Sequence, residues 1–215
     1  MLRQCSIILL LGFVLTGCAG FDTSRATSET RSAVSQQDLR HGKYRNVAIF
    51  IEGIGEPERS AAEQIVISAL QAAGMNPTSA VALFAERGSV TEQAKADVVQ
   101  KEFDAVLYWT VVQKGVVEEL VPNARSNGEF ITFKTGFLMV THNLTSDYIM
   151  KQDGSVYQPQ LALKTKVDLQ DAKTAKQVWT SETVSSGNPK VASMNTLFGQ
   201  ASQQIVEKMK SDDVI

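Results

Sequence analysis

Apolar positions recur at spacings that predict strands and helices along most of the chain. Residues 47–51 form a short continuous apolar run, which is typical of a strand covered on both faces. A glycine-containing turn follows, and Pro57 can occupy the first position of a helix. Gly74 then marks the end of that helix. The predicted apolar stripe of the helix comprises Ala62, Ile65, Val66, Ala69, Leu70 and Ala73.

The second half of the chain has the patterns of strands and one final helix. Residues 105–112 and 130–141 are predicted strands, separated by a loop that contains Pro122 and Asn123. Apolar and polar residues alternate over 161–169, which indicates a half-buried strand. A turn at 171–174 returns the chain as a hairpin partner over 177–184. The final helix is expected to begin at Asn188 and Pro189, and its stripe comprises Val191, Met194, Phe198, Ala201, Ile205 and Met209.

Two weaker signals complete the predicted order of elements. Residues 77–84 are expected to contain a short strand, and a capping-box pattern at 89–92 should open a helix through about residue 102. The resulting order is strand, helix, strand, helix, several strands and helix. This order predicts the α/β class as a two-layer α+β sandwich, in which a mixed sheet carries about three helices, mainly on one face.

The beginning of the chain has the pattern of an export signal. Arg3 precedes an apolar run over residues 6–15, which is too short to span a membrane. The sequence Leu-Thr-Gly-Cys at 15–18 resembles the lipobox of bacterial lipoproteins, which implies removal of residues 1–17 and lipidation of Cys18. An ordinary secreted protein is the alternative. Ala19 follows the cysteine, and by resemblance to the enterobacterial sorting rule this favours the outer membrane, on its periplasmic side.

The segment after the cysteine is rich in polar residues and has no apolar periodicity. Residues 18–43 are therefore predicted to be the lipidated cysteine and a flexible tether, and residues 44–215 a single domain. The net charge of −2 disfavours nucleic acid as a partner. Cys5 leaves with the signal peptide and Cys18 is used by lipid, so no disulfide or cysteine metal site is expected.

Three features together resemble a group of bacterial envelope lipoproteins. They are the lipobox, the early strand whose helix ends in Ala-Ala-Gly at 72–74, and the segment VDLQDAKTAKQVW at 167–179. This combination resembles the domain of the curli-secretion lipoprotein family and the N-terminal domain of the Tol–Pal beta-propeller protein. The resemblance implies a binding or assembly module rather than an enzyme. Residue roles are not transferred, because the shared motifs are short.

Motifs that could carry chemistry are incomplete. The Gly53–Gly55 turn has Glu58 at the position of the third glycine of a phosphate loop, so we favour a plain turn. Lys134-Thr135-Gly136 lacks the earlier Ser-x-x-Lys of penicillin-recognising enzymes. The histidines, His41 and His142, do not form a ligand pattern. The carboxylates Asp97, Glu102, Asp104, Asp168 and Asp171 fall at helix ends and turns, where capping is the favoured role.

The large aromatic residues are the best candidates for a partner surface. Tyr108, Trp109 and Trp179 can each anchor a contact if exposed, although we expect at least two of them to seal packing between sheet and helices. Residues 130–140 are either a core strand, which we favour, or an exposed edge that pairs with another subunit.

The sequence thus predicts a non-enzymatic binding or assembly module of the envelope, without cofactor or metal. Its expected partners are the membrane, through the lipid, and an envelope protein or a second copy. The alternatives are a subunit of an oligomeric secretion channel and, less favoured, a periplasmic hydrolase.

Overall fold

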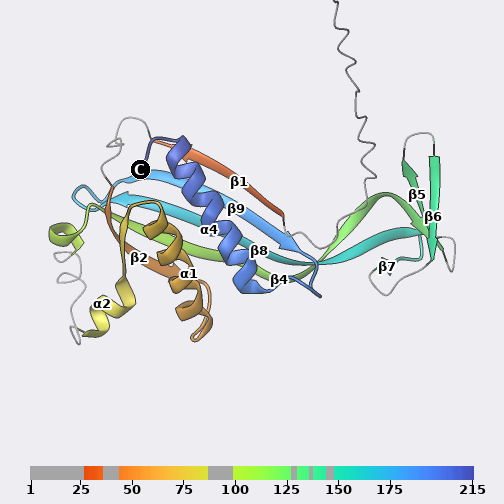
Figure 1. Cartoon of the computed structure of the whole chain (residues 1–215), viewed down its shortest axis with the longest axis horizontal. Helices are drawn as coiled ribbons and strands as arrows, with labels where there is room; N and C mark the ends of the chain where they lie inside the picture. The colour runs from red at the N-terminus through yellow and green to blue at the C-terminus, as the bar shows by residue number, and fades with distance from the viewer. Residues whose placement is uncertain (1–26, 36–43, 87–98, 127–129, 136–137, 144–147) are drawn as a thin grey trace, which may run out of the picture.

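The computed structural model describes residues 27–35, 44–86, 99–126, 130–135, 138–143 and 148–215. One mixed sheet runs through all of these ranges, in the order β1-β9-β8-β4-β2-β3 (Figure 1). Strand β5 pairs with both β4 and β6, so β5 and β6 form a hairpin beside β4, and β7 pairs with β8. The strands are β1 (Thr27–Val34), β2 (Asn46–Glu52), β3 (Asn76–Ser79), β4 (Ala105–Ser126), β5 (Phe130–Thr135), β6 (Leu138–Asn143), β7 (Ile149–Met150), β8 (Ser155–Asp171) and β9 (Gln177–Gly187).

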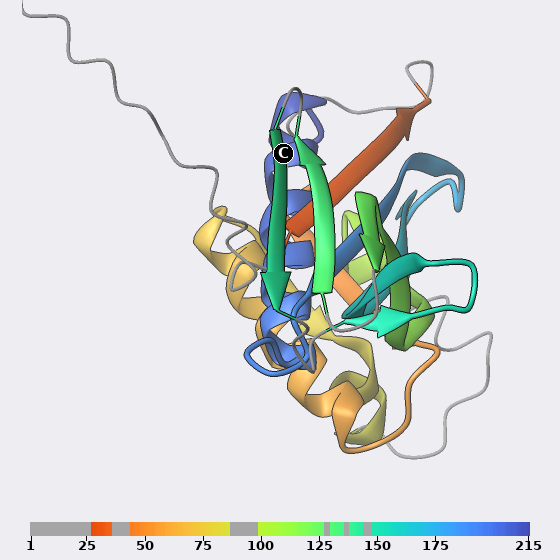
Figure 2. The ribbon, with the colours of Figure 1, turned by 90° about the vertical axis from the view of Figure 1, so that its right-hand side faces the viewer.

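The helices form the second layer and confirm the predicted two-layer class. Helices α1 (Glu58–Ala72) and α4 (Met194–Ser211) contact each other on one face of the sheet (Figure 2). Helix α2 (Ala80–Glu86) follows β3 and packs Leu83 against a small cluster around Ala48 on the opposite face. The described helices therefore lie mainly on one side, as predicted.

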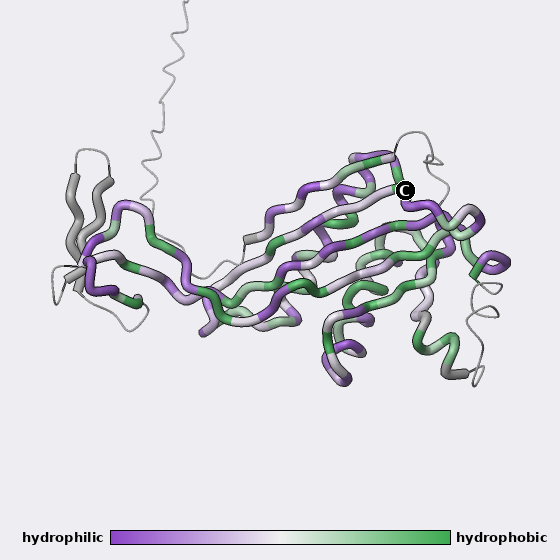
Figure 3. The backbone as a smooth tube through the Cα atoms, turned by 180° about the vertical axis from the view of Figure 1, so that it is seen from behind, coloured by the Kyte–Doolittle hydropathy of each residue, from purple (hydrophilic) through white to green (hydrophobic). Residues whose placement is uncertain are grey.

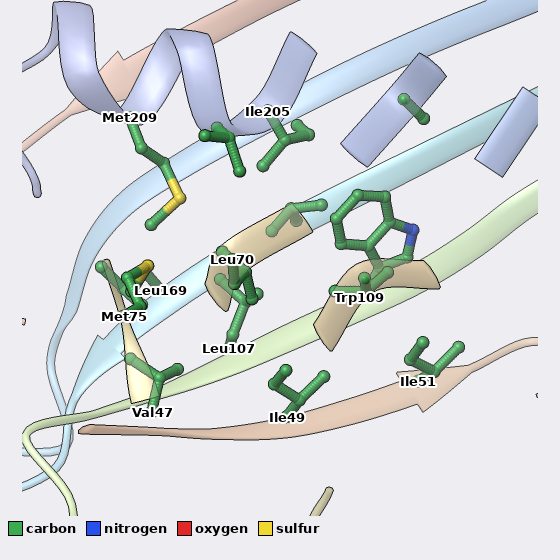
Figure 4. Close-up of a cluster of buried hydrophobic side chains, with 14 of the residues drawn as sticks. Val47, Ile49, Ile51, Leu70, Met75, Leu107, Trp109, Leu169, Ile205 and Met209 are labelled. Carbon is green, nitrogen blue, oxygen red and sulfur yellow. The ribbon is translucent and has the colours of Figure 1, made fainter. Parts of the chain in front are cut away.

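The hydrophobic core lies between the sheet and the pair α1 and α4. Alternate residues of β2 and β4 point into it, because side chains alternate between the faces of a strand. Figure 4 shows these residues facing Leu70 of α1 and Ile205 of α4. The largest side chains that are almost fully buried there are Trp109, Trp179, Tyr44, Ile49, Ile51, Leu70, Leu107, Leu163, Leu169, Leu197 and Ile205.

The first predicted strand, which is β2, and the first predicted helix, which is α1, agree with the predicted pattern. Strand β2 pairs in parallel with both β3 and β4, so it is an inner strand, as its continuous apolar run indicated. The turn after it has a specific need for glycine. Gly53 has a φ of +82°, and a Cβ there would collide with the backbone of Val111. This packing explains the glycine without any phosphate-binding role.

The β8–β9 hairpin is also confirmed. Leu163, Val167 and Leu169 are fully buried, while Lys164 and Lys166 between them lie on the other face. Asp171 forms the turn, since its Oδ1 accepts hydrogen bonds from the backbone N–H groups of Lys173 and Thr174. This is the turn role predicted for that carboxylate.

Strand β1 contradicts the prediction of a tether over residues 18–43. Thr27–Val34 pairs antiparallel with β9 and forms an edge of the sheet. Hydroxyl groups link the strands: Ser28 bonds to Ser185 at 2.9 Å, and Thr30 bonds to Thr183 at 3.0 Å. The flexible-tether prediction is therefore wrong for β1, because hydroxyl pairs replace the apolar contacts that strand patterns usually show. Residues 18–26 and 36–43 lie outside the described residues.

The region 112–143 differs most from the prediction. Strand β4 continues to Ser126 through the predicted loop, and its irregularity between Leu120 and Arg125 accommodates Pro122 and Asn123. The single strand expected over 130–141 is a hairpin of β5 and β6, whose backbone lies beyond the part of the sheet that the helices cover (Figure 1). The prediction of one strand over this segment is therefore wrong.

Two helix predictions also change. Helix α4 begins at Met194, with Ser193 as its N-cap, because the Ser193 side chain accepts a hydrogen bond from the N–H of Thr196. Asn188 instead closes a turn in which its carbonyl accepts from Ala192. Residues 77–84 contain the end of β3 and the first part of α2. The helix predicted from residue 89 falls mostly on 87–98, outside the described residues.

Candidate functional site

The long strands β4 and β8 extend past the helices as a two-stranded arm. We define the arm as residues 116–126 of β4 and 155–161 of β8, which pair antiparallel. The 22 residues of β4 greatly exceed the length that the body of the sheet uses. Figure 1 shows the arm leading away from α1 and α4, with the β5–β6 hairpin at its far end. One face of the arm carries a small hydrophobic cluster, in which Val121, Ala124 and Val156 are buried and Tyr148 packs against them.

The arm exposes aliphatic side chains on one face. Val116 is 62% exposed and Leu120 is 53% exposed. In the pairing register, Leu120 lies opposite Tyr157, and Tyr157 lies opposite Ile149 of β7, so these side chains share a face. We call Val116, Leu120, Ile149 and Tyr157 the arm surface. This surface was not predicted from the sequence, although Val116 and Leu120 stand at a spacing that keeps side chains on one face of a strand.

A charged pair crosses the arm surface. Glu118 lies between Val116 and Leu120 on the same face, and its carboxylate is 3.0 Å from Nζ of Lys151. The same Nζ lies 4.2 Å from the centre of the Tyr157 ring. The hydrogen bond to Glu118 and the negative charge of that carboxylate raise the pKa of Lys151. The arm surface therefore combines apolar side chains with both signs of charge.

A groove between α1 and α4 provides a second uncovered apolar surface. Its cavity volume is about 630 Å³, and it lies on the outer side of the helices. Ile65, Ala69 and Val206 supply apolar lining, while Glu207 and Lys210 stand among its polar residues. The groove is also lined by the small residues Ala72, Ala73 and Gly199. The groove and the arm surface lie in different parts of the molecule (Figure 1).

The three aromatic residues that were predicted for a partner surface differ in their burial. Trp109 and Trp179 are each 1% exposed, so they are core residues, and their proposed place on a partner surface is wrong. Their burial confirms the expectation that at least two of the three seal the packing. Tyr108 lies on the opposite face of β4, half-buried and stacked on Phe50 with ring centres 5.3 Å apart.

Besides Asp171, two more of the predicted carboxylates serve structural roles. Asp104 accepts hydrogen bonds from the backbone N–H groups of Arg45 and Asn46, which joins the start of β2 to the start of β4. Asp168 accepts a hydrogen bond from Thr180 across the β8–β9 pair. Within the described ranges, no group of three His, Cys, Asp or Glu side chains is placed to hold a metal ion.

The predicted lipidation site lies outside the described residues, as do Asp97 and His41. For His142 in β6, the structure describes the backbone alone. Among the described helices, none has both the length and the apolar character needed to span a membrane.

No protein-family model and no curated protein matches the chain. Among solved structures, the PelC dodecamer from Paraburkholderia phytofirmans is similar in fold, with a TM-score of 0.45 and 12% identity over 87% of this chain and 97% of that one. The lipoprotein GNA1162 from Neisseria meningitidis has a TM-score of 0.44 and 13% identity over 78% of this chain and 99% of that one. The resemblance to the curli-secretion and Tol–Pal families stays a prediction.

Proposed function

We propose that this chain is a lipid-anchored protein on the periplasmic side of the outer membrane, without enzymatic activity, that assembles with copies of itself through its arm. The exposed arm surface carries the proposal for assembly. Val116 and Leu120 keep more than half of their surface in water. Burying such side chains against another protein is favourable, at about 25 cal/mol for each Å² removed from water.

A second copy is the proposed occupant because one chain carries both halves of a contact. The arm surface protrudes, whereas the α1–α4 groove is concave, and both mix aliphatic side chains with charges of both signs. The arm leads away from its own helices, so it would fill the groove of another copy (Figure 1). Such head-to-tail contacts use two different surfaces and build rings or open chains.

The arm also bears on the channel alternative. Self-association is what a channel subunit would need, and the arm surface supports it. A lipid-facing strand would need an apolar face without charge, whereas Glu118 and Lys151 lie on the same face as Val116 and Leu120. Placing these charges in lipid would cost several kcal/mol. We therefore prefer a contact between proteins to contact with lipid for this surface.

The assembly proposal predicts a specific loss when the arm surface is charged. The full-length chain in a nonionic detergent should form oligomers, and the double variant Val116→Glu, Leu120→Glu should weaken association about 30-fold or more, as loss of a central apolar contact does. Sedimentation velocity, with the micelle density-matched, measures this. Val191→Glu is the matched control, since Val191 is also 62% exposed but lies outside the arm. A monomeric wild-type chain, or equal loss in the control, contradicts the proposal.

Mixing two defective variants tests the head-to-tail geometry. Ala72→Glu places a charge in the groove, at an exposed position. Alone, it should also prevent assembly. A mixture of the arm variant and the groove variant should form dimers and nothing larger, because each mixed pair retains one intact arm and one intact groove. A mixture that stays monomeric would show that arm and groove are not partners.

The lipid anchor has its own test. Cells that express the chain and are supplied with a palmitate analogue should label the wild-type protein at Cys18. The variant Cys18→Ser should lose the label and be released from the membrane fraction, since more than one acyl chain is needed for stable anchoring. An unlabelled wild-type protein, or equal labelling of Cys18→Ser, would remove the anchor from the proposal and leave the arm contact untouched.

A further inference from the structure

A cleft lies on the face of the sheet opposite α1 and α4. Figure 3 shows the backbone from that side. Its volume is about 370 Å³, which falls in the range of small-molecule sites. Strands β2, β4 and β8 supply its floor through Phe50, Tyr108 and Gln170. Helix α2 supplies a wall through Phe84. The arm and the α1–α4 groove contribute no residue to this cleft, so it is a separate site.

Aromatic rings line one part of the cleft. Phe50 and Tyr108 are direct neighbours in the parallel register of β2 and β4, and their rings stack with an angle of 17° between their planes. Phe84 approaches Phe50 with ring centres 6.4 Å apart. All three rings are only half-buried. An aromatic ring carries negative charge density on its face, so a ring face that is open to the cleft attracts cations.

The charged residues around the cleft also favour a cation. Glu52 ends β2 beside these rings, and Asp171 lies at the end of β8. The cleft lining that the structure describes includes no lysine, arginine or histidine. Glu52 is exposed, and no ion pair to it is found within the described ranges. Its side chain belongs to the lining of the cleft.

The phenol group of Tyr108 is a hydrogen-bond donor in this setting. Burial, followed by the negative charge of Glu52, raises the pKa of Tyr108 above its ordinary value of 10.0. The hydroxyl group therefore stays neutral at physiological pH. It can donate a hydrogen bond to a polar group of a bound molecule.

We propose that this cleft binds a small organic cation of the quaternary ammonium class. The methyl groups of such a cation would pack on the rings of Phe50 and Tyr108, and its charge would be balanced by Glu52. A quaternary ammonium group suits these residues because it carries no N–H group, and so needs no hydrogen-bond acceptor from the rings of Phe50 and Phe84.

Choline, with its uncharged carbon isostere 3,3-dimethylbutan-1-ol, tests the proposal on the full-length chain in a nonionic detergent. Broadening of the ligand methyl proton resonances gives each Kd. Choline should bind at least about fivefold more tightly than the isostere, since the two differ in charge but hardly in shape. Equal affinities, or no choline binding below about 100 mM, would overturn the proposal, because the attraction of the rings and of Glu52 for a positive charge would then be absent from the site.

Variants locate the binding and control for folding. Glu52→Gln should weaken choline binding about fivefold, and Tyr108→Leu by a similar factor, whereas Tyr108→Phe should keep it within about twofold because the ring remains. Glu119→Gln is the matched control, an exposed glutamate on the arm. If Glu119→Gln weakens binding as much as Glu52→Gln does, the attraction is non-specific and the proposal fails. Near-UV circular dichroism confirms that each variant is folded.

Discussion

Replacing Phe198 with aspartate should remove a large part of the stability of the fold. Phe198 lies on the sheet side of α4, is 4% exposed and belongs to the main hydrophobic core. An unpaired charge at such a site costs about 3–5 kcal/mol. Domains of this size are stable by about 5–15 kcal/mol, so a loss of about 3–5 kcal/mol brings a domain at the lower end of that range close to unfolding. The two buried tryptophans, Trp109 and Trp179, give a fluorescence signal for denaturant titration.

Two further variants on α4 separate burial from helix propensity. Gln203→Asp adds the same charge at an exposed position of the same helix, and it should change the free energy of unfolding by less than about 1 kcal/mol. Phe198→Leu keeps the site apolar and should cost about 1–2 kcal/mol through lost volume. A Phe198→Asp variant within about 1 kcal/mol of the wild type, on the scale expected for surface positions, would mean that α4 does not cover the sheet as described.

Much of the fold could be predicted from apolar periodicity, because apolar residues recur at regular spacing in the strands and helices that enclose the core. The continuous run of β2 and the alternation in β8 both gave the correct burial, and so did the opposite orientation of Tyr108 and Trp109. Strand β1 was missed for a physical reason. Its inward positions carry Ser28, Thr30 and Ser32, so the alternation is of hydroxyl groups with charged residues, and hydropathy does not detect it.

The arm was missed because turn-forming residues lie inside a strand. Pro122 and Asn123 normally end a strand, but here an irregularity in the β4–β8 pairing absorbs them, and Asn123 adopts a φ of +61°. The cleft could not be predicted from local sequence at all. Phe50, Phe84 and Tyr108 are distant in the chain, and the parallel pairing of β2 with β4 brings the first and last of them together.

Asp212 connects three elements at the edge of the sheet that β1 forms. Strand β1 is the first described element after the predicted anchor. Its Oδ2 accepts hydrogen bonds from Oγ of Ser32 at 2.6 Å and from Nε1 of Trp179 at 2.8 Å. Its Oδ1 accepts from Nζ of Lys208 at 2.9 Å. Strand β1, strand β9 and the end of α4 therefore meet at one carboxylate. If Cys18 carries lipid, any force from the membrane reaches the body first through β1.

The variant Asp212→Ala should cost about 2–3 kcal/mol of unfolding free energy, because it removes hydrogen bonds to a charged group and leaves the buried N–H of Trp179 without its acceptor. Amide hydrogen exchange should accelerate in β1, which loses the contact of Ser32. Glu207→Ala, at an exposed acid of the same helix, should leave both quantities nearly unchanged. Equal exchange rates in β1 of wild type and Asp212→Ala would show that β1 is held by its strand pairing alone.

The pH dependence of this contact has a defined sign. Burial by itself would raise the pKa of Asp212, but the hydrogen bonds from Ser32, Trp179 and Lys208, with the charge of Lys208, outweigh burial and lower it below 3.8. The unfolded chain therefore takes up a proton at higher pH than the folded chain does. The stabilisation is complete well above pH 3.8 and is lost as the pH falls through the lower, folded pKa. We expect the difference in unfolding free energy between wild type and Asp212→Asn to be constant from about pH 7 to about pH 5 and to shrink below about pH 4. A difference that grew on acidification would mean that burial, rather than the three donors, sets the pKa of this carboxyl group.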